Sequence, residues 1–180
     1  MAGALVKTAL GLGVAAAVAG FRFAYRSDLA ASRARLTGRS SLIETRLGPV
    51  EVADSGAGPP VLVVHGAAGG FDMGLQVGED MLGGDFRILA PSRFGYLRSP
   101  MPEAASHADQ ADVFAALLDA LDLPRVAVVA VSAGAQSATQ LALRHPDRVS
   151  ALVLITPALY LPPPPGPVTA GPPDFIFDYV

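Results

Sequence analysis

The sequence predicts an α/β fold built on a doubly wound, mostly parallel β-sheet. Four short apolar runs, at residues 61–64, 86–90, 126–131 and 149–155, indicate strands that are buried on both faces. Two segments with apolar residues at helical spacing lie between the later runs, one beginning after Ser106 and one at residues 133–144. Buried strands that alternate with amphipathic helices are typical of a parallel sheet covered by helices.

Composition narrows the class of protein further. The chain has 180 residues, of which 51% are hydrophobic and 16% are charged, with a net charge of −3. These values exclude a disordered, charge-rich chain and favour one domain with appendages. They imply no basic surface for nucleic acid. The chain has no cysteine and three widely spaced histidines, so we expect no disulfide, no metal site and no cofactor.

The N-terminal segment, residues 1–40, differs from ordinary domain sequence. A charge-free run at residues 8–21 has 14 residues, shorter than the ~20 that a membrane-spanning helix needs. Arginines follow it, and basic flanks favour a membrane anchor or signal anchor. A cleaved signal peptide and an Ala/Gly-rich surface helix are the alternatives. We therefore expect membrane association through residues 1–26, with an exported or a cytoplasmic location as alternatives.

The C-terminal segment, residues 157–180, is rich in proline. Eight of the chain's 16 prolines lie at residues 157–173, where the lack of N–H donors disfavours helix and strand. This leaves residues 41–156 to form the folded core.

The core elements follow one another in a regular order. Residues 43–47 and 50–53 predict a hairpin that turns at Gly48-Pro49, and residues 54–60 predict a loop. Ser106 and Asp109 form a capping box for a helix whose apolar face is Val113, Phe114, Leu117, Leu118 and Leu121. Leu123-Pro124 ends this helix, and Pro146 ends the helix at residues 133–144.

Ser132 is the first candidate functional residue. It lies where the strand at residues 126–131 turns directly into a helix, which predicts a sharp turn with the hydroxyl exposed at the sheet edge. Ala130 and Gly134 are the small neighbours that such a turn needs. The N-terminus of the following helix directs its N–H groups at a ligand above Ser132. An ordinary helix start is the alternative interpretation.

The loop at residues 65–70 is the second candidate. It has the sequence His-Gly-Ala-Ala-Gly-Gly and follows the strand at residues 61–64. Small residues let backbone N–H groups approach a ligand, as an oxyanion hole requires. A tight turn or a phosphate loop is the alternative, but the glycine patterns of nucleotide-binding loops are absent here.

Taken together in this order, the two loops resemble those of the α/β-hydrolase superfamily. The segment at residues 88–100 and the link at residues 145–155 also resemble family segments, so the resemblance covers about residues 42–157. Two positions depart from the family pattern: Ala130 replaces the usual first glycine, and Ser92 replaces an aspartate. The elbow holds a serine, which excludes the aspartate nucleophile of dehalogenases and epoxide hydrolases.

The resemblance implies roles for three residues. Ser132 would be the nucleophile that forms an acyl-enzyme, and the N–H groups of Ala67 and Ala133 would form the oxyanion hole. The family's acid and base lie on loops after strands seven and eight, and this sequence resembles the family only through the sixth strand. His65 is expected to shape the oxyanion loop rather than act as the base. The remaining candidates are His107, expected at the surface, His145, expected to cap a helix, and Asp174 and Asp178 as acids.

The resemblance also has structural consequences. It makes residues 149–155 an edge strand, and an open apolar edge predicts poor solubility of residues 41–180. The Pro-rich tail lies where the family inserts a lid. We expect a serine hydrolase for an ester-like or small acyl substrate, incomplete and inactive alone. The alternative is a non-catalytic binding protein that retains part of the hydrolase sheet.

Overall fold

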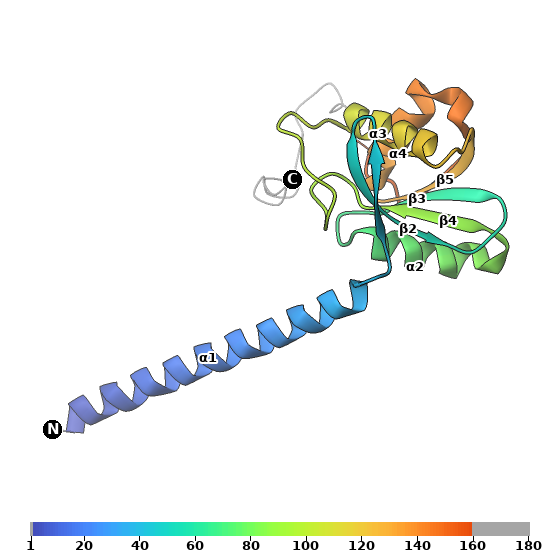
Figure 1. Ribbon diagram of the computed structural model, residues 1–180. Helices are drawn as coiled ribbons and strands as arrows, with labels where there is room; N and C mark the ends of the chain where they lie inside the picture. The colour runs from blue at the N-terminus through green and yellow to red at the C-terminus, as the bar shows by residue number, and fades with distance from the viewer. Residues whose placement is uncertain (1, 160–180) are drawn as a thin grey trace.

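The computed structural model describes residues 2–159, with side chains from residue 11 onward except that of residue 12. Its center is a six-stranded mixed sheet (Figure 1). In sheet order the strands are β1 (Ser41–Thr45), β2 (Gly48–Ser55), β4 (Arg87–Pro91), β3 (Pro60–Val64), β5 (Val126–Val131) and β6 (Val149–Ile155). The last four are parallel, whereas β2 is antiparallel to both of its neighbours. The predicted α/β fold is confirmed.

Four helices accompany the sheet. They are α1 (Ala2–Leu36), α2 (Phe71–Leu82), α3 (His107–Ala120) and α4 (Gly134–Arg144). Single 3₁₀ turns at Gly83–Asp85 and Pro146–Arg148 lead into β4 and β6. The bounds of α3, α4 and the four parallel strands agree with the sequence prediction to within about one residue at most ends.

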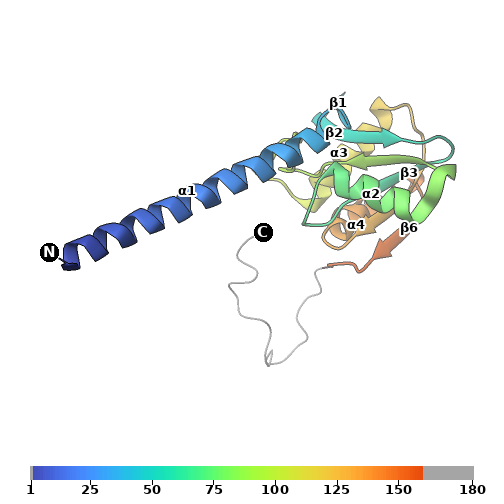
Figure 2. The ribbon, with the colours of Figure 1, turned by 90° about the horizontal axis from the view of Figure 1, so that it is seen from below.

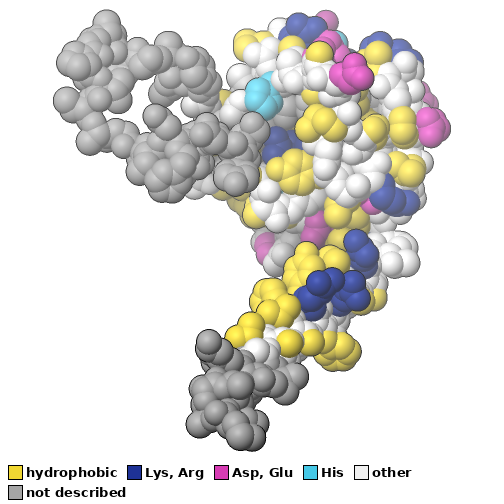
Figure 3. All heavy atoms as spheres, turned by 90° about the vertical axis from the view of Figure 1, so that its left-hand side faces the viewer, with side chains coloured by type: hydrophobic (Ala, Val, Ile, Leu, Met, Phe, Trp, Pro, Cys, Tyr) yellow, Lys and Arg dark blue, Asp and Glu magenta, His cyan; other side chains and the backbone are white. Residues whose placement is uncertain are grey.

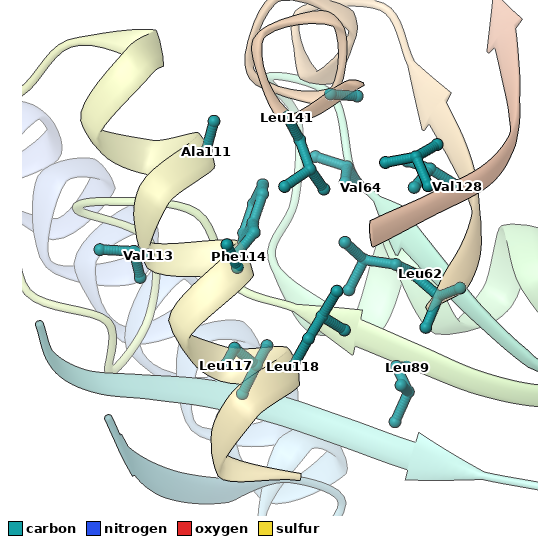
Figure 4. Packing of buried hydrophobic residues seen from close by; sticks show 14 of the residues in the cluster. Leu62, Val64, Leu89, Ala111, Val113, Phe114, Leu117, Leu118, Val128 and Leu141 are labelled. Carbon is teal, nitrogen blue, oxygen red and sulfur yellow. The ribbon is translucent and has the colours of Figure 1, made fainter. Parts of the chain in front are cut away.

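The larger half of the core lies between the sheet and helices α3 and α4. Phe114, Leu117 and Leu118 of α3 are fully buried and belong to one cluster with Leu62 and Leu89 of the sheet (Figure 4). Burial of each such side chain stabilises the fold by about 1.5–3 kcal/mol. The helix begins at the predicted capping box, in which the Ser106 hydroxyl accepts the Asp109 N–H and the Asp109 carboxylate accepts the Ser106 N–H.

Helix α2 covers the other face of the sheet, and the sequence analysis did not predict it. Phe71 and Leu75 are buried against strands β3 and β4. Two glycines inside the segment, Gly74 and Gly78, weaken its helical pattern in the sequence. The structure explains why glycine is needed at these two positions. A Cβ at Gly74 would lie 2.9 Å from the Val63 carbonyl oxygen, and one at Gly78 would lie 2.7 Å from the Ile88 side chain. The glycines therefore let α2 lie close to the sheet.

The hairpin β1–β2 forms, but the predicted position of its turn is wrong. Thr45 pairs with Gly48, so Arg46 and Leu47 make the turn and Gly48-Pro49 begins β2. The Thr45 hydroxyl closes the turn early by accepting the Leu47 N–H (3.1 Å) and donating to the Gly48 carbonyl (2.7 Å). Gly48 adopts φ of +106°, which glycine tolerates.

Helix α1 projects away from the body of the protein as one straight rod (Figure 2). Apolar side chains and arginines alternate around its surface (Figure 3). Among the described residues, no helix has the length and apolarity to cross a bilayer. Most of the Pro-rich segment expected to begin a lid lies outside the described residues.

Strand β6 is the edge of the described sheet, as the resemblance implied. It pairs with β5 alone, and Val153 at its middle is 49% exposed. An unpaired strand edge with exposed apolar residues is a template for association with another chain.

We predict that Val153→Lys raises the monomeric fraction of the full chain by placing a charge on the exposed edge strand. Because the side chain is half exposed, the free energy of unfolding should change by only about 0.5 kcal/mol. Size-exclusion chromatography with light scattering measures the monomeric fraction. Leu143→Lys is the matched control, since Leu143 is 70% exposed and lies on α4 rather than on the edge strand. Equal gains from both variants would contradict the role of the edge.

Candidate active site

Ser132 occupies the sharp turn that the sequence predicts between β5 and α4. Its φ is +49°, a left-handed conformation that is strained for a residue with a Cβ. Three backbone hydrogen bonds hold this conformation: the Ser132 N–H donates to the Ile155 carbonyl (3.0 Å), and the Ser132 carbonyl accepts from Ala135 (3.1 Å) and Ala158 (3.0 Å). The surrounding backbone thus enforces the strain.

Small neighbours make this turn sterically feasible. Ala130 is fully buried. A Cβ at Gly134 would lie 2.5 Å from the His65 carbonyl oxygen and 2.7 Å from that of Val64. Any larger residue at position 134 would push helix α4 away from strand β3.

The loop at residues 65–70 lies beside Ser132. A Cβ at Gly66 would lie 3.3 Å from the Ser132 Cβ, so the two predicted loops are in contact. Within residues 2–159, the N–H groups of Ala67 and Ala133 have no acceptor. Their assignment to an oxyanion hole stays a prediction.

His65 is fully buried, and both of its ring nitrogens are engaged. Nε2 accepts the Arg93 backbone N–H (2.9 Å), so the proton is on Nδ1, which donates to the Gly66 carbonyl (2.7 Å). Burial lowers the pKa of His65 to about 4, and the Arg93 charge contributes to the lowering. The ring therefore shapes the loop, as predicted, and has no nitrogen left to accept a proton from Ser132.

Arg93 is a site residue that the sequence analysis missed. It is only 8% exposed, and its guanidinium donates to the Gly66 carbonyl (3.2 Å) and, at longer range, to the Ala133 carbonyl (3.4 Å). It also lies 5.1 Å from the center of the Tyr96 ring. Tyr96 in turn packs edge-on against His65 and donates its hydroxyl proton to the Ala67 carbonyl (3.1 Å). The sequence feature that could have identified Arg93 as a site residue is its position, two residues after the end of the buried strand β4.

Ser92, which stands where the family commonly has aspartate, is part of a buried polar network. Its hydroxyl accepts the Phe71 N–H (3.1 Å) and donates to the Glu51 carboxylate (3.0 Å). Arg98 pairs with the same carboxylate at 2.7 Å. Burial alone would raise the pKa of Glu51, but hydrogen bonds from Arg98, Ser40 and Ser92 outweigh it and lower that pKa. This network fixes the loop after β4.

The other predicted acid and base candidates lie elsewhere. His145 caps the C-terminal end of α4, as predicted, and binds Asp112 at 2.7 Å. His107 is exposed at the start of α3, also as predicted, and partial burial and the Arg93 charge lower its pKa. Asp174 and Asp178 lie outside the described residues. In the part of the chain that the structure describes, no cluster of metal-binding side chains is found.

A hollow on the described surface lies beside the site rather than at Ser132. It has a volume of about 580 Å³ and lies between the end of α1 and the loop after β4, lined by residues such as Leu36, Phe71 and Leu97. No residue of the Ser132 turn lines it, so we base the site on the geometry of the two loops.

Comparisons with known proteins identify the fold family. The sequence profile of the alpha/beta hydrolase fold matches residues 59–179. The chain is 34% identical over 106 residues to the 2-hydroxymuconate semialdehyde hydrolase of Pseudomonas sp. strain CF600, covering 57% of this chain and 38% of that enzyme. It is 33% identical to an uncharacterized hydrolase of Bacillus subtilis, covering 59% of this chain and 37% of the relative. The chain thus spans less than two fifths of these relatives' length.

Solved structures give the same result. An alpha/beta hydrolase fold protein from Nakamurella multipartita is 41% identical, with a TM-score of 0.63 over 66% of this chain and 41% of that chain. A thermophilic esterase from Thermogutta terrifontis is 28% identical, with a TM-score of 0.56 over 65% of this chain and 45% of that chain.

We predict that the free energy of unfolding falls as the pH drops from 6.5 toward 4, because of His65. The folded state keeps His65 neutral down to about pH 4, whereas the unfolded chain takes up the proton near its ordinary pKa of 6.5. The stability is fully present above pH 6.5 and decreases by about 1.4 kcal/mol per pH unit below it.

Urea unfolding between pH 7 and about pH 5, where most carboxylates stay ionised, measures this slope. His65→Gln lowers stability at every pH but should remove most of the slope. His107→Gln is the comparison: the pKa of His107 is also lowered, but this side chain is exposed, so its loss should remove a smaller part of the slope than the loss of His65. An unchanged slope in His65→Gln would refute the assignment.

Proposed function

The chain belongs to the alpha/beta hydrolase fold family, and from this premise we propose that it carries the nucleophile of a serine hydrolase acting on an ester-like or other small acyl substrate. The observation that supports the proposal most directly is the conformation of Ser132. Ser132 is left-handed at a strand-to-helix turn and contacts a His-Gly loop, which is the arrangement expected of a nucleophilic serine in this fold.

The proposed reaction proceeds through an acyl-enzyme. The Ser132 oxygen attacks the substrate carbonyl carbon while its proton passes to a base, and the carbonyl oxygen becomes an oxyanion. In this proposal the N–H groups of Ala67 and Ala133, which have no acceptor among the described residues, receive the oxyanion. The leaving group departs with a proton, and water then hydrolyses the acyl-Ser132 ester.

We propose that none of the three histidines serves as the base. His65 has both ring nitrogens engaged, and His145 pairs with Asp112 at the far end of α4. His107 is exposed and makes no hydrogen bond to Ser132 in the described structure. Without a base the serine is a weak nucleophile, so this chain alone should react slowly. The matched part of the chain covers less than two fifths of each relative, and a base from the remainder of such a protein would complete the site.

The proposed substrate class follows from the relatives. Their names describe hydrolases of small molecules, among them a semialdehyde hydrolase and an esterase. Ester hydrolysis and carbon–carbon bond hydrolysis both pass through attack of a serine on a carbonyl carbon. The alternative, a non-catalytic binding protein, is favoured by the absence of a base partner for Ser132 within residues 2–159.

We predict that a fluorophosphonate probe labels the full chain at Ser132 slowly, and roughly tenfold faster or more when free imidazole is added. Imidazole takes the place of the missing base: it removes the Ser132 proton as the oxygen–phosphorus bond forms and fluoride leaves. Intact-mass spectrometry follows the rate, and peptide mapping identifies the labelled residue.

Two variants make this test specific. Ser132→Ala should abolish the imidazole-dependent labelling, whereas Ser150→Ala, at an exposed serine on β6, should leave it unchanged. Absence of labelling in a folded chain with imidazole present would reject the hydrolase proposal and favour the binding protein.

We also propose that residues 1–26 hold the protein at an anionic membrane surface. The apolar residues Val14, Val18, Phe21, Phe23 and Tyr25 of α1 are 52–76% exposed. Arginines at positions 22, 26, 33, 35 and 39 lie on or directly after the same helix, opposed in this stretch by Asp28 alone. Exposed aromatic residues next to arginines suit the boundary between lipid headgroups and acyl chains.

We predict that the chain floats with vesicles containing phosphatidylserine. The double substitution Phe21→Ser and Phe23→Ser should reduce the bound fraction severalfold, because it removes buried apolar area from the lipid contact. Leu143→Ser, equally exposed but on α4, is the control that should retain binding. Equal flotation of the double variant and wild type would refute the proposal.

A further inference from the structure

Arg93 carries a buried positive charge with no carboxylate partner among the described residues. It is 8% exposed, and its Nε atom has no hydrogen-bond partner. Its other contacts are the carbonyl oxygens of Gly66 and Ala133 and the hydroxyl and ring of Tyr96. Burial of an uncompensated charge costs free energy, so a position that retains one calls for a reason beyond packing.

The neighbouring Arg98 provides a comparison within the same loop. Arg98 is neutralised by the Glu51 carboxylate at 2.7 Å and also donates to Ser40. Arg98 thus supports the loop as an ordinary ion pair. Arg93, five residues earlier, instead directs its charge at the carbonyl groups of the two loops that meet at Ser132.

The most informative contact is with the Gly66–Ala67 peptide. Its carbonyl oxygen accepts from His65 Nδ1 (2.7 Å) and from Arg93 Nη2 (3.2 Å). In a trans peptide the N–H points opposite to the carbonyl, so these two donors turn the Ala67 N–H away from themselves. The Tyr96 hydroxyl holds the next carbonyl, that of Ala67, at 3.1 Å. Donors on a carbonyl oxygen also polarise the attached N–H and strengthen it as a donor.

We infer that Arg93 is a positioning residue for the oxyanion site. It fixes the orientation of the Gly66–Ala67 peptide, and its uncompensated charge lies behind the N–H that would receive the oxyanion. The inference rests on the proposed function of Ser132 and adds to it a source of oxyanion stabilisation that the backbone alone does not supply. Because the guanidinium is buried and its contacts are carbonyl groups, Arg93 acts through the peptide rather than by touching the substrate.

Binding of phenylboronic acid tests the inference without a catalytic base. Boron accepts a lone pair of the Ser132 oxygen while the hydroxyl proton leaves to solvent, which gives a tetrahedral boronate with one negative charge. Boron-11 NMR distinguishes this adduct from the free trigonal acid, and a titration gives its Kd in the full chain.

We expect Arg93→Gln to raise the Kd by roughly tenfold to a hundredfold, since removal of a single oxyanion donor costs that much or more. Arg93→Lys, which keeps the charge, should recover part of the affinity. Arg98→Gln removes a guanidinium from the same loop but none of the contacts to the Gly66 or Ala133 carbonyl groups, so its effect on the Kd, which we expect to be smaller, measures disturbance of the loop alone. Equal losses in Arg93→Gln and Arg98→Gln, or no loss in Arg93→Gln, would overturn the inference. An Arg93→Lys protein as weak as Arg93→Gln would contradict the role of the charge.

The proposed function and this inference fail in different ways. Adduct formation that persists in Ser132→Ala, or that never occurs, rejects the role of Ser132. The amide NMR signal of Ala67 in the ligand-free chain then tests Arg93 by itself. We expect this signal to shift in Arg93→Gln and to shift less in Arg98→Gln. An Ala67 signal that moves no more in the first variant than in the second would overturn the role of Arg93.

Discussion

The buried imidazole of His65 is the contact on which the arrangement of the site depends. Its Nδ1 holds the Gly66 carbonyl and its Nε2 holds the Arg93 N–H, so one ring joins the loop after β3 to the loop after β4. This bridge requires a neutral ring with a single tautomer, because Nε2 must accept while Nδ1 donates. Burial enforces the neutral form by lowering the pKa to about 4. The ring is thus a structural element of the site.

Two charged side chains near this bridge, Glu51 and Arg93, are buried, and they differ in their partners. The Glu51 carboxylate receives donors from Arg98, Ser40 and Ser92, so its charge is compensated and the loop after β4 is fixed. The Arg93 guanidinium contacts carbonyl oxygens and the hydroxyl and ring of Tyr96, and no carboxylate among the described residues. Compensation of the Glu51 charge is needed for stability, because a buried charge without a partner costs free energy. The Arg93 charge leaves positive potential beside Ser132, where the chemistry that we propose develops negative charge.

The sequence was a good guide wherever local pattern and tertiary packing agree. The strand at residues 126–131 and the serine turn after it were predictable, because a continuous apolar run leads directly into small residues at helical spacing. Helix α2 was not predictable in this way. Its Gly74 and Gly78 lower helix propensity, and they are required by contact with strands that only the folded sheet brings near.

The polar contacts of the site also include some that local sequence predicted and some that only the fold reveals. That His65 would shape its own loop followed from its position, but its partner, the Arg93 N–H, lies 28 residues away. Likewise, the sequence showed only that Ser92 replaces an aspartate that is common in the family. In the structure the carboxylate comes instead from Glu51 on β2, 41 residues earlier in the chain, and binds the Ser92 hydroxyl. A single sequence carries no signal for such a pairing.

Strand β6 links the stability of the sheet to the geometry of the serine. The Ile155 carbonyl at its end accepts the Ser132 N–H, and Ala158 just beyond it donates to the Ser132 carbonyl. A left-handed serine costs of order 1–3 kcal/mol, and these bonds are what the turn has to offset it. The strained conformation therefore depends on the strand that is the exposed edge of the described sheet. Any segment that pairs with β6 would therefore brace the turn at Ser132 as well as cover the edge, because the strand at the edge also accepts the Ser132 N–H.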